Sequence, residues 1–358
     1  MCRGWIQLLL ICGLWVTCGA GAPPTVSLAP PSVTAGQAWS PEAPAGRWML
    51  RCQISGVSEC KLDRSPNRAR RFDLQSTCYR DGERLDVETT RWDEGKPVRA
   101  WRSIVNRWYV SYEVPPVGEQ SPLGFYAADG SAFAGAAIPS AWGAFDGYIA
   151  DDYIRFTDVL KTASRVQTSQ ETVDGFSCLV IKAQSPDYGS YQVWLDMAAD
   201  RLPRKVVVEK TAANYWGKIR LKQWTYLAPR GSHGTVPLQR VTFTMGQVKL
   251  DQVQGRWFPL GCQVTRENHY ADGNVQRTEM TCHRNGLDLD PDFAAAKAFV
   301  PQLRQGARLA NQIEPQLAFQ WKNQSPVPLV DSGLVAGMDQ TATTLQQEMN
   351  RSQKAGAK

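Results

Sequence analysis

Pairs of cysteine thiols are the groups in this chain best able to do chemistry, because they can form disulfides or bind zinc. Nine cysteines occur among the 358 residues, and those beyond residue 22 are Cys52, Cys60, Cys78, Cys178, Cys262 and Cys282. No Cys-x-x-Cys pair occurs, and the histidines His233, His269 and His283 are scattered. Neighbouring residues of a strand point to opposite faces, so Cys282 and His283 do not share a ligand site. We therefore expect disulfides and no metal.

A β-hairpin centred on Asp272 places two of these cysteines opposite each other. The segments 257–267 and 275–284 are strand-like, and Gly273 can adopt the left-handed conformation that closes a three-residue loop. The hairpin sets four pairs face to face: Tyr270 with Asn274, Glu267 with Arg277, Val264 with Met280, and Cys262 with Cys282. A disulfide at the last pair needs no backbone movement.

The other four cysteines allow several connectivities, which sequence alone does not resolve. Cys52 and Cys60 are symmetric about Gly56, so their pairing is the most economical prediction. Cys78 is then left to pair with Cys178.

A second hairpin is predicted between strands 72–79 and 85–92, which flank the turn sequence Asp81-Gly82. Its register pairs Cys78 with Leu85, Ser76 with Val87, and Leu74 with Thr89. The opposite face is expected to be exposed to solvent, because it carries the polar residues Gln75, Thr77, Asp86 and Glu88.

Three alternating acids, in the segment 288–292, have the spacing that opens a calcium loop. However, Phe293 and Phe299 stand where that loop needs Gly and Glu. Asp290 followed by Pro291 instead predicts the start of a short helix.

Catalytic arrangements are absent from the sequence. Asp151-Asp152 suits a helix N-terminus, and Ser232-His233-Gly234 reads as a turn between strands. No Gly-rich phosphate loop, nucleophile elbow or His-Glu-x-x-His element occurs. We expect no enzymatic activity and no cofactor.

The N-terminus predicts export. Met1-Cys2-Arg3 is positively charged, residues 6–16 are apolar, and 19–22 are small, as in a cleaved signal peptide. The apolar stretch is shorter than the ~20 residues of a membrane span, and no later window approaches that length. Lipid attachment at Cys18 is disfavoured because Trp15-Val16-Thr17 lacks the expected residues before it. The predicted location is the periplasm or cell envelope, with no transmembrane span in the mature chain.

The net charge of +6 is modest, and a dense basic cluster occurs at Arg64, Arg68, Arg70 and Arg71. Such a run usually covers a solvated strand end. An exported chain without interleaved basic and aromatic motifs does not fit nucleic-acid binding. Composition does not define an oligomeric state.

The sequence divides into six expected parts. These are a signal peptide (1–22), a Pro/Ala-rich tether (23–46), an N-terminal β region (47–114), a Gly/Ala/aromatic insert (115–150), a half-barrel (151–330) and a mobile C-terminal tail (331–358). Within the insert, 121–148 is expected to be among the least ordered parts, because Gly and Ala offer little to bury.

The fold class predicted is mainly β, within α+β: a curved antiparallel sheet or incomplete β-barrel around one or two helices, supported by disulfides. The clearest helix is 151–163, with an apolar stripe at Tyr153, Phe156, Val159 and Leu160. The strands expected after it are 176–183, 191–196, 205–210, 218–227 and 239–250, followed by the Asp272 hairpin.

Apolar residues alternate along these strands, and so define one face of the sheet. Those taken as candidates for lining a ligand pocket are Val193, Leu221, Phe243, Met245, Val264 and Met280. Alternation alone does not distinguish a pocket from a filled core.

Four short motifs of the chain resemble those of the bacterial outer-membrane lipoprotein-sorting proteins and their relatives. They lie between about residues 152 and 290: the run 174–180, Val193-Trp194-Leu195-Asp196, Leu202-Pro203-Arg204-Lys205-Val206 and Gly255-Arg256-Trp257-Phe258-Pro259. The resemblance implies an incomplete barrel closed by helices, which holds acyl chains on its concave face in the periplasm. The six cysteines and the long N-terminal β region depart from the compact carriers of that family.

Two functions follow as expectations. The first is a non-catalytic envelope protein that binds a hydrophobic ligand, such as an acyl chain, a lipid or an acylated protein, in the half-barrel. The second is a structural or protein-interaction module with a filled core and no ligand.

Overall fold

The computed structural model describes residues 46–60, 69–114, 124–127, 134–150, 155–214, 238–311 and 318–329. All of them belong to one compact unit, 34–358. Several sequence-based expectations therefore lie outside the described residues: the signal peptide, nearly all of the tether, the strand 218–227 with Leu221, the turn at His233, the Asp151-Asp152 pair, and the C-terminal tail.

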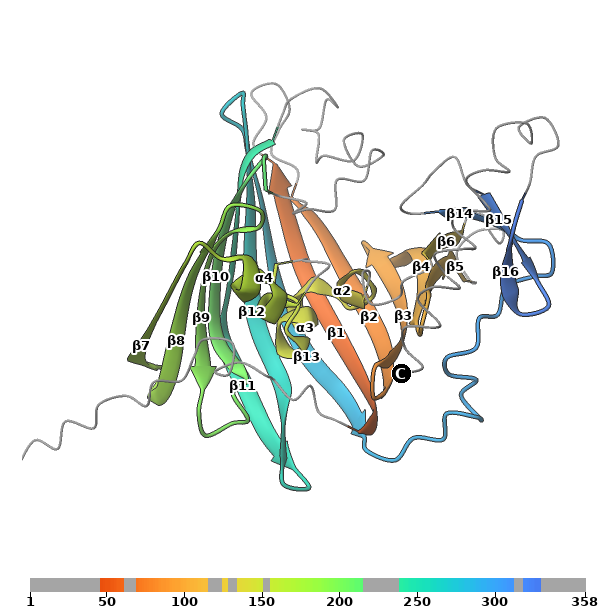
Figure 1. The fold of residues 1–358 in the computed structure, drawn as a ribbon, viewed down its shortest axis with the longest axis horizontal. Helices are drawn as coiled ribbons and strands as arrows, with labels where there is room; N and C mark the ends of the chain where they lie inside the picture. The colour runs from red at the N-terminus through yellow and green to blue at the C-terminus, as the bar shows by residue number, and fades with distance from the viewer. Residues whose placement is uncertain are drawn as a thin grey trace, which may run out of the picture. The chain divides into compact units, whose positions relative to one another are not determined.

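The described strands form one 16-stranded sheet (Figure 1). From one edge to the other they are β16 (Ser325–Pro328), β15 (Ala318–Lys322), β14 (Arg308–Asn311), β6 (Gly124–Ala127), β5 (Tyr109–Glu113), β4 (Lys96–Val105), β3 (Arg84–Asp93), β2 (Arg70–Asp81), β1 (Arg47–Cys60), β13 (Val275–Asp288), β12 (Arg256–Tyr270), β11 (Leu238–Val253), β10 (Pro203–Thr211), β9 (Gly189–Asp196), β8 (Phe176–Ser185) and β7 (Arg165–Val173). The 12 strands from β5 to β7 form an antiparallel, curved sheet that is not closed. The prediction of a mainly β fold with an open, curved sheet is confirmed.

The pairing of β1 with β13 joins the N-terminal β region to the strands of the predicted half-barrel. Ile54 lies opposite Cys282, and the two strands pair along almost their whole length, from Met49 to Cys60. The N-terminal β region and the predicted half-barrel are therefore continuous parts of one sheet.

The predicted Asp272 hairpin has the expected register. Cys262 lies opposite Cys282, and Val264 lies opposite Met280. Gly273 has a φ of 80°, and its N–H donates to the Tyr270 carbonyl at 3.1 Å, which closes the loop. The structure does not join these two cysteines by a disulfide, so the predicted bond itself is not observed.

The β2–β3 hairpin differs from its prediction by a shift of two residues. Cys78 lies opposite Val87, and the last pair is Asp81 with Arg84. Gly82 has a φ of 58° and so occupies the first central position of a tight two-residue turn, whereas the prediction placed it second. A shift of two residues keeps every side chain on its predicted face of the sheet. The face that was expected to be exposed to solvent is partly covered, however, because Asp86 is buried.

The other predicted cysteine pairs are wrong. Cys52 and Cys60 lie in the same strand, β1, about 26 Å apart at the usual rise per residue, whereas bonded cysteines have Cα atoms within about 7 Å. Six strands of the sheet lie between Cys78 in β2 and Cys178 in β8. The sheet instead collects Cys52, Cys78, Cys262 and Cys282 in one buried apolar cluster.

The helical residues lie on the concave face of the sheet (Figure 1). They are α2 (Ala134–Ala137), α3 (Ser140–Gly143), the 3-10 turn η2 (Ala144–Asp146) and α4 (Phe156–Thr162). The helix predicted at 151–163 corresponds to α4, which buries Phe156, Val159 and Leu160. No helix in the described ranges is both long enough and apolar enough to span a membrane.

A segment after β13 packs on the opposite face of the sheet. Its backbone N–H at Phe299 donates to Asp86 Oδ2 at 2.7 Å, and its carbonyl at Lys297 accepts from Arg102 Nη2 at 2.8 Å. Asp86 and Arg102 form a buried bidentate ion pair with distances of 2.6 and 2.9 Å. No helix starts at Asp290 as predicted; instead Asp292 Oδ1 accepts from the N–H groups of Ala294 and Ala295 and organises a set of turns.

Replacement of Asp86 by alanine should lower the free energy of unfolding by about 3–5 kcal/mol, because Arg102 would be left buried without its counter-charge. Urea denaturation measures the change. Asp158→Ala is the matched control, since Asp158 forms an exposed pair with Lys161 that contributes less than about 1 kcal/mol. Equal losses from the two variants would contradict the assignment.

Candidate functional site

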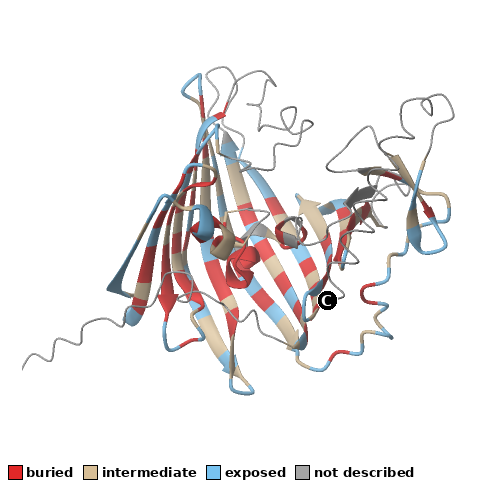
Figure 2. Cartoon of the chain, in the orientation of Figure 1, coloured by how far each residue is buried: buried red, intermediate tan, exposed pale blue. Residues whose placement is uncertain are grey.

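The candidate site lies between the concave face of the sheet and residues 134–150, which we call the cover segment. The cover segment crosses the sheet, with α2 beside β3 and β4 and α3 beside β12. Its buried side chains join the main apolar core. They are Ala137, Ile138, Trp142, Ala144, Phe145, Tyr148 and Ile149. Figure 2 shows that the strands beneath the segment also carry many buried residues.

The expectation that this part of the insert offers little to bury is wrong for residues 134–150. Its glycines serve close packing: Gly147 has a φ of 86°, and a Cβ at Gly143 would lie 2.9 Å from the Tyr148 carbonyl oxygen. The nearby aromatic residues Trp142 and Phe145 are only 5% exposed. The glycines therefore shape a compact turn that presents aromatic rings to the sheet.

The backbone hydrogen bonds recorded for the cover segment lie within it or join it to α4. Tyr148 N–H donates to the Gly143 carbonyl at 2.8 Å, and the Gly147 carbonyl accepts from Phe156 of α4 at 2.8 Å. Within the described ranges, no backbone hydrogen bond recorded for this segment reaches the sheet. Side chains therefore hold it in place.

A buried ion pair is the main polar contact between the cover segment and the sheet. Arg80 Nη1 of β2 lies 3.0 Å from Asp146 Oδ1 of η2, and the two side chains are 4% and 9% exposed. Arg80 also donates from Nε to the Gly82 carbonyl at 3.1 Å, which fixes the guanidinium. At the end of the segment, Arg155 donates to the Tyr148 hydroxyl at 3.4 Å and to Glu83 at 3.0 Å.

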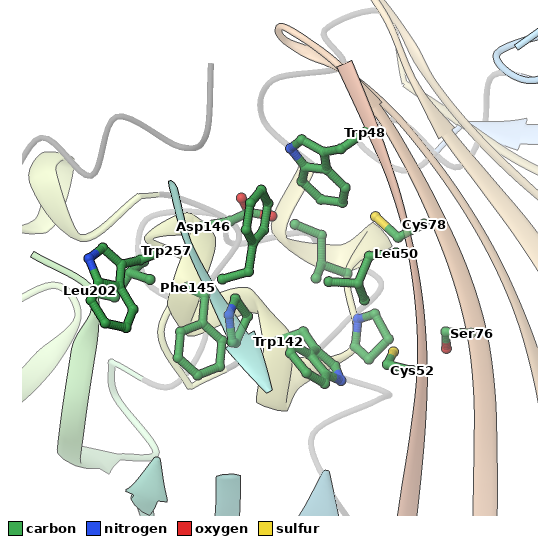
Figure 3. A pocket seen from close by; sticks show the side chains of 14 residues that line it. Trp48, Leu50, Cys52, Ser76, Cys78, Trp142, Phe145, Asp146, Leu202 and Trp257 are labelled. Atoms are coloured by element: carbon green, nitrogen blue, oxygen red, sulfur yellow. The ribbon is translucent and has the colours of Figure 1, made fainter. Parts of the chain in front are cut away.

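A cavity of about 40 Å³ remains between the cover segment and the sheet (Figure 3). Nearly all of its lining is apolar: Trp48, Leu50, Cys52, Ser76, Cys78, Ile138, Pro139, Trp142, Phe145, Asp146, Leu202, Trp257, Phe258 and Pro259. This volume holds about one or two water-sized groups and is far smaller than an acyl chain. In this conformation the cavity is therefore too small to hold an acyl chain.

The polar groups at the cavity are nearly all paired. Ser76 Oγ lies 2.9 Å from Thr89 Oγ1, and Asp146 is bound to Arg80. The indole N–H of Trp142, by contrast, is buried without a hydrogen-bond partner among the described residues. One residue of the lining thus carries a buried donor that is not paired within the described part of the chain.

The buried thiols of the main apolar core, of which Cys52 and Cys78 line the cavity, are held in their neutral form. Burial raises the pKa of Cys52 to about 12, partly offset by a hydrogen bond with Ser76. Burial also raises the pKa of Cys78 well above its ordinary value, and the charge of Asp146 adds to the shift. A hydrogen bond with Cys262, followed by burial, raises the pKa of Cys282. Neutral thiols are poor nucleophiles, so they form apolar lining.

Five of the six predicted ligand-lining residues lie in or against the main apolar core, and the sixth, Leu221, lies outside the described residues. Val193, Phe243, Met245 and Val264 are fully buried there, and Met280 packs against them half-buried. None of these lines the 40 Å³ cavity, whose lining comes from β1, β2, β12, the cover segment and Leu202, which precedes β10. The sequence signal for that lining was the series of aromatic residues in the insert, whose partners come from distant strands.

A second hollow of about 510 Å³ is open to solvent and lies across β2, β1, β13 and β12. Val264 and Met280 contribute to its lining, together with the charged residues Arg71, Asp73, Arg277 and Glu279. Ser55 donates to Asp73 at 2.5 Å and Arg277 donates to Glu279 at 2.9 Å, so several of these groups already have partners. Its mixed polar lining does not suit a hydrocarbon chain.

Among the described residues, no group of three or more His, Cys, Asp or Glu side chains has an arrangement that could hold a metal ion.

No family model and no curated protein matches this sequence. The chain is similar to a solved outer membrane lipoprotein-sorting protein domain from Vibrio parahaemolyticus, with a TM-score of 0.33 and 13% identity over 69% of this chain and 86% of that one. A LolA superfamily protein from Nitrosomonas europaea has a TM-score of 0.34 and 12% identity, with 69% and 88% covered. A DUF1329 family protein from Desulfovibrio piger has a TM-score of 0.35 and 12% identity, with 70% and 89% covered. The resemblance read from the sequence motifs is thus found again among solved structures.

The raised pKa predicts that Cys52 of the reduced, folded protein reacts very slowly with iodoacetamide at pH 8. A pKa of about 12 in place of 9.0 lowers the thiolate fraction roughly a thousandfold, and reactivity should rise only as the pH approaches 12. Peptide mapping after timed alkylation gives the rate, with the same protein in urea as the control. Equal rates in the folded and the unfolded protein would show that Cys52 is not buried.

Proposed function

We propose that this protein is a non-catalytic exported protein that binds a hydrophobic ligand, an acyl chain of a lipid or lipoprotein, between the concave face of its sheet and the cover segment. The observation that carries the proposal is the apolar concave face covered by a segment that has no recorded backbone pairing to it. Outward displacement of such a cover exposes a continuous apolar surface to a ligand.

The contacts of the cover segment suit reversible displacement. Its apolar side chains leave the sheet only if another apolar group replaces them, because exposing them to water costs about 25 cal/mol per Å². An acyl chain is such a group. Since the internal hydrogen bonds of the segment do not depend on the sheet, the segment can move without unfolding.

The ion pair between Arg80 and Asp146 sets the balance between the covered and the displaced arrangement. Both charges are buried, and breaking the pair on one side leaves an uncompensated charge in the covered state. A ligand that binds only the displaced arrangement gains affinity when the covered arrangement is weakened.

The alternative is a structural or interaction module whose core is filled and takes no ligand. The small volume of the cavity, about 40 Å³, is the observation in its favour. The two functions differ in whether the cover segment ever leaves the sheet.

Export to the periplasm or cell envelope is part of the proposal, and there an oxidant can join Cys262 to Cys282. The two thiols already face each other across β12 and β13 and share a hydrogen bond. The bond would fix the register of these strands beneath the cover segment.

Asp146→Asn should raise the affinity for a fluorescent acyl ester about tenfold, because Arg80 then loses its partner only in the covered arrangement. Fluorescence titration measures the affinity, and native mass spectrometry of protein purified without detergent detects bound lipid. Asp158→Asn, which alters the exposed ion pair of α4, is the control and should leave the affinity unchanged. A protein that takes up no lipid, with or without the Asp146 change, would support the filled module instead.

Cys262→Ser combined with Cys282→Ser should lower the melting temperature of the oxidised protein by several degrees, since the closed loop of about 20 residues stabilises by roughly 3 kcal/mol. Differential scanning calorimetry measures the shift. Non-reducing peptide mapping tests the premise, and two free thiols in protein recovered from an oxidising compartment would refute it. Cys178→Ser, in a separate cluster on β8, serves as the control.

A further inference from the structure

We infer that Trp142 recognises the carbonyl group of the ligand, so that the site prefers chains joined through a neutral ester or amide over plain hydrocarbon or ether chains. This inference rests on the proposed function and specifies its ligand class. Trp142 lies on the cover segment and lines the cavity in Figure 3. Trp142 is 5% exposed, and its indole N–H has no hydrogen-bond partner among the described residues.

An indole nitrogen can only donate, so the group that satisfies it must be an acceptor. A buried donor left unpaired costs about 1–3 kcal/mol, which makes an acceptor from outside the protein favourable. The nearby acceptors of the protein are committed: Ser76 pairs with Thr89, and Asp146 pairs with Arg80. The ligand is therefore the source of the missing acceptor.

The carbonyl oxygen of an ester or amide is such an acceptor, and it brings no net charge into a mostly apolar lining.

The rest of the lining suits the hydrocarbon on either side of such a carbonyl. Leu50 and Phe258 of the sheet and Ile138 of the cover segment contribute apolar surface around the 40 Å³ cavity. A carbonyl with an adjacent methylene group is about the size that this volume admits. The remainder of the chain would occupy space that opens when the cover segment moves outward.

Matched ligands test the inference without changing the protein. 1-Dodecanoylglycerol carries an ester carbonyl, and 1-O-dodecylglycerol is the ether that lacks it. The wild-type protein should bind the ester about fivefold more tightly than the ether, which is the gain in affinity expected from one net hydrogen bond. Isothermal titration calorimetry measures both affinities. Equal affinities for the ester and the ether would overturn the inference while leaving hydrophobic binding itself intact.

Trp142→Phe removes the N–H and keeps an aromatic ring, so it should bring the ester-to-ether ratio close to one. Trp257→Phe is the matched control, because Trp257 lines the same cavity and its nitrogen is not among the buried unpaired atoms of the described residues. Its ratio should stay near five. A Trp142→Phe protein with an unchanged ratio would also overturn the inference.

An infrared measurement reports the hydrogen bond directly. The ¹³C-labelled carbonyl of bound 1-dodecanoylglycerol should shift to lower frequency in the wild-type protein and not in Trp142→Phe. The affinity for N-dodecanoyl serine amide is measured in parallel. Tighter binding of this amide would identify an acylated amine as the natural ligand class, and tighter binding of the ester would identify a glycerolipid. If neither compound nor the ether binds at all, the proposed function fails and the inference fails with it.

Discussion

The apolar concave face of an open sheet is the constraint on which this structure depends. A curved sheet that does not close must cover that face, because exposed apolar surface of this extent is unfavourable in water. The cover segment does so with aromatic side chains on a tight, glycine-shaped backbone. Arg80 and Asp146 add one buried charge pair to an otherwise apolar contact. The fold is thus a continuous sheet with a separate cover, and the proposed ligand site lies between the two.

The two faces of the sheet are stabilised differently. On the opposite face, Asp86 binds both Arg102 and the backbone of Phe299, which ties the segment after β13 to the sheet. Arg204 and Asp196 form a further buried pair at 2.7 Å, which joins the beginning of β10 to the end of β9. These contacts combine side-chain and backbone hydrogen bonds, whereas the cover segment is held to the sheet by side chains. Any conformational change is therefore expected on the concave side.

Local features of the fold could be predicted from the sequence. The register of the Asp272 hairpin could be predicted because it depends on one short loop and on the alternation of apolar and polar residues in its two strands. The β2–β3 hairpin was misplaced by two residues, since the choice of turn position for Gly82 depends on backbone geometry that Asp81-Gly82 alone does not determine. The strand β7 was not predicted because most of its residues are exposed and polar, so it lacks the alternation that marks a half-buried strand.

Features that depend on distant contacts could not be predicted in the same way. Cys52 meets Cys78, Cys262 and Cys282 only because β1 lies between β2 and β13, a pairing that no local pattern encodes. Likewise, the glycines of the insert suggested little burial, yet Gly143 and Gly147 allow the close turn that buries Trp142 and Phe145. The candidate site therefore emerged from the placement of the cover segment on the sheet.

The most direct test of this account is to locate a bound chain by photocrosslinking. A dodecanoyl ester with a diazirine group on its acyl chain is bound to the full-length protein, irradiated, and mapped by peptide mass spectrometry. The account predicts crosslinks on both sides of the site, to the β1 peptide that contains Leu50 and to the cover-segment peptide that contains Trp142 and Phe145. Crosslinks confined to the open, charged hollow around Arg71 and Arg277 would contradict it.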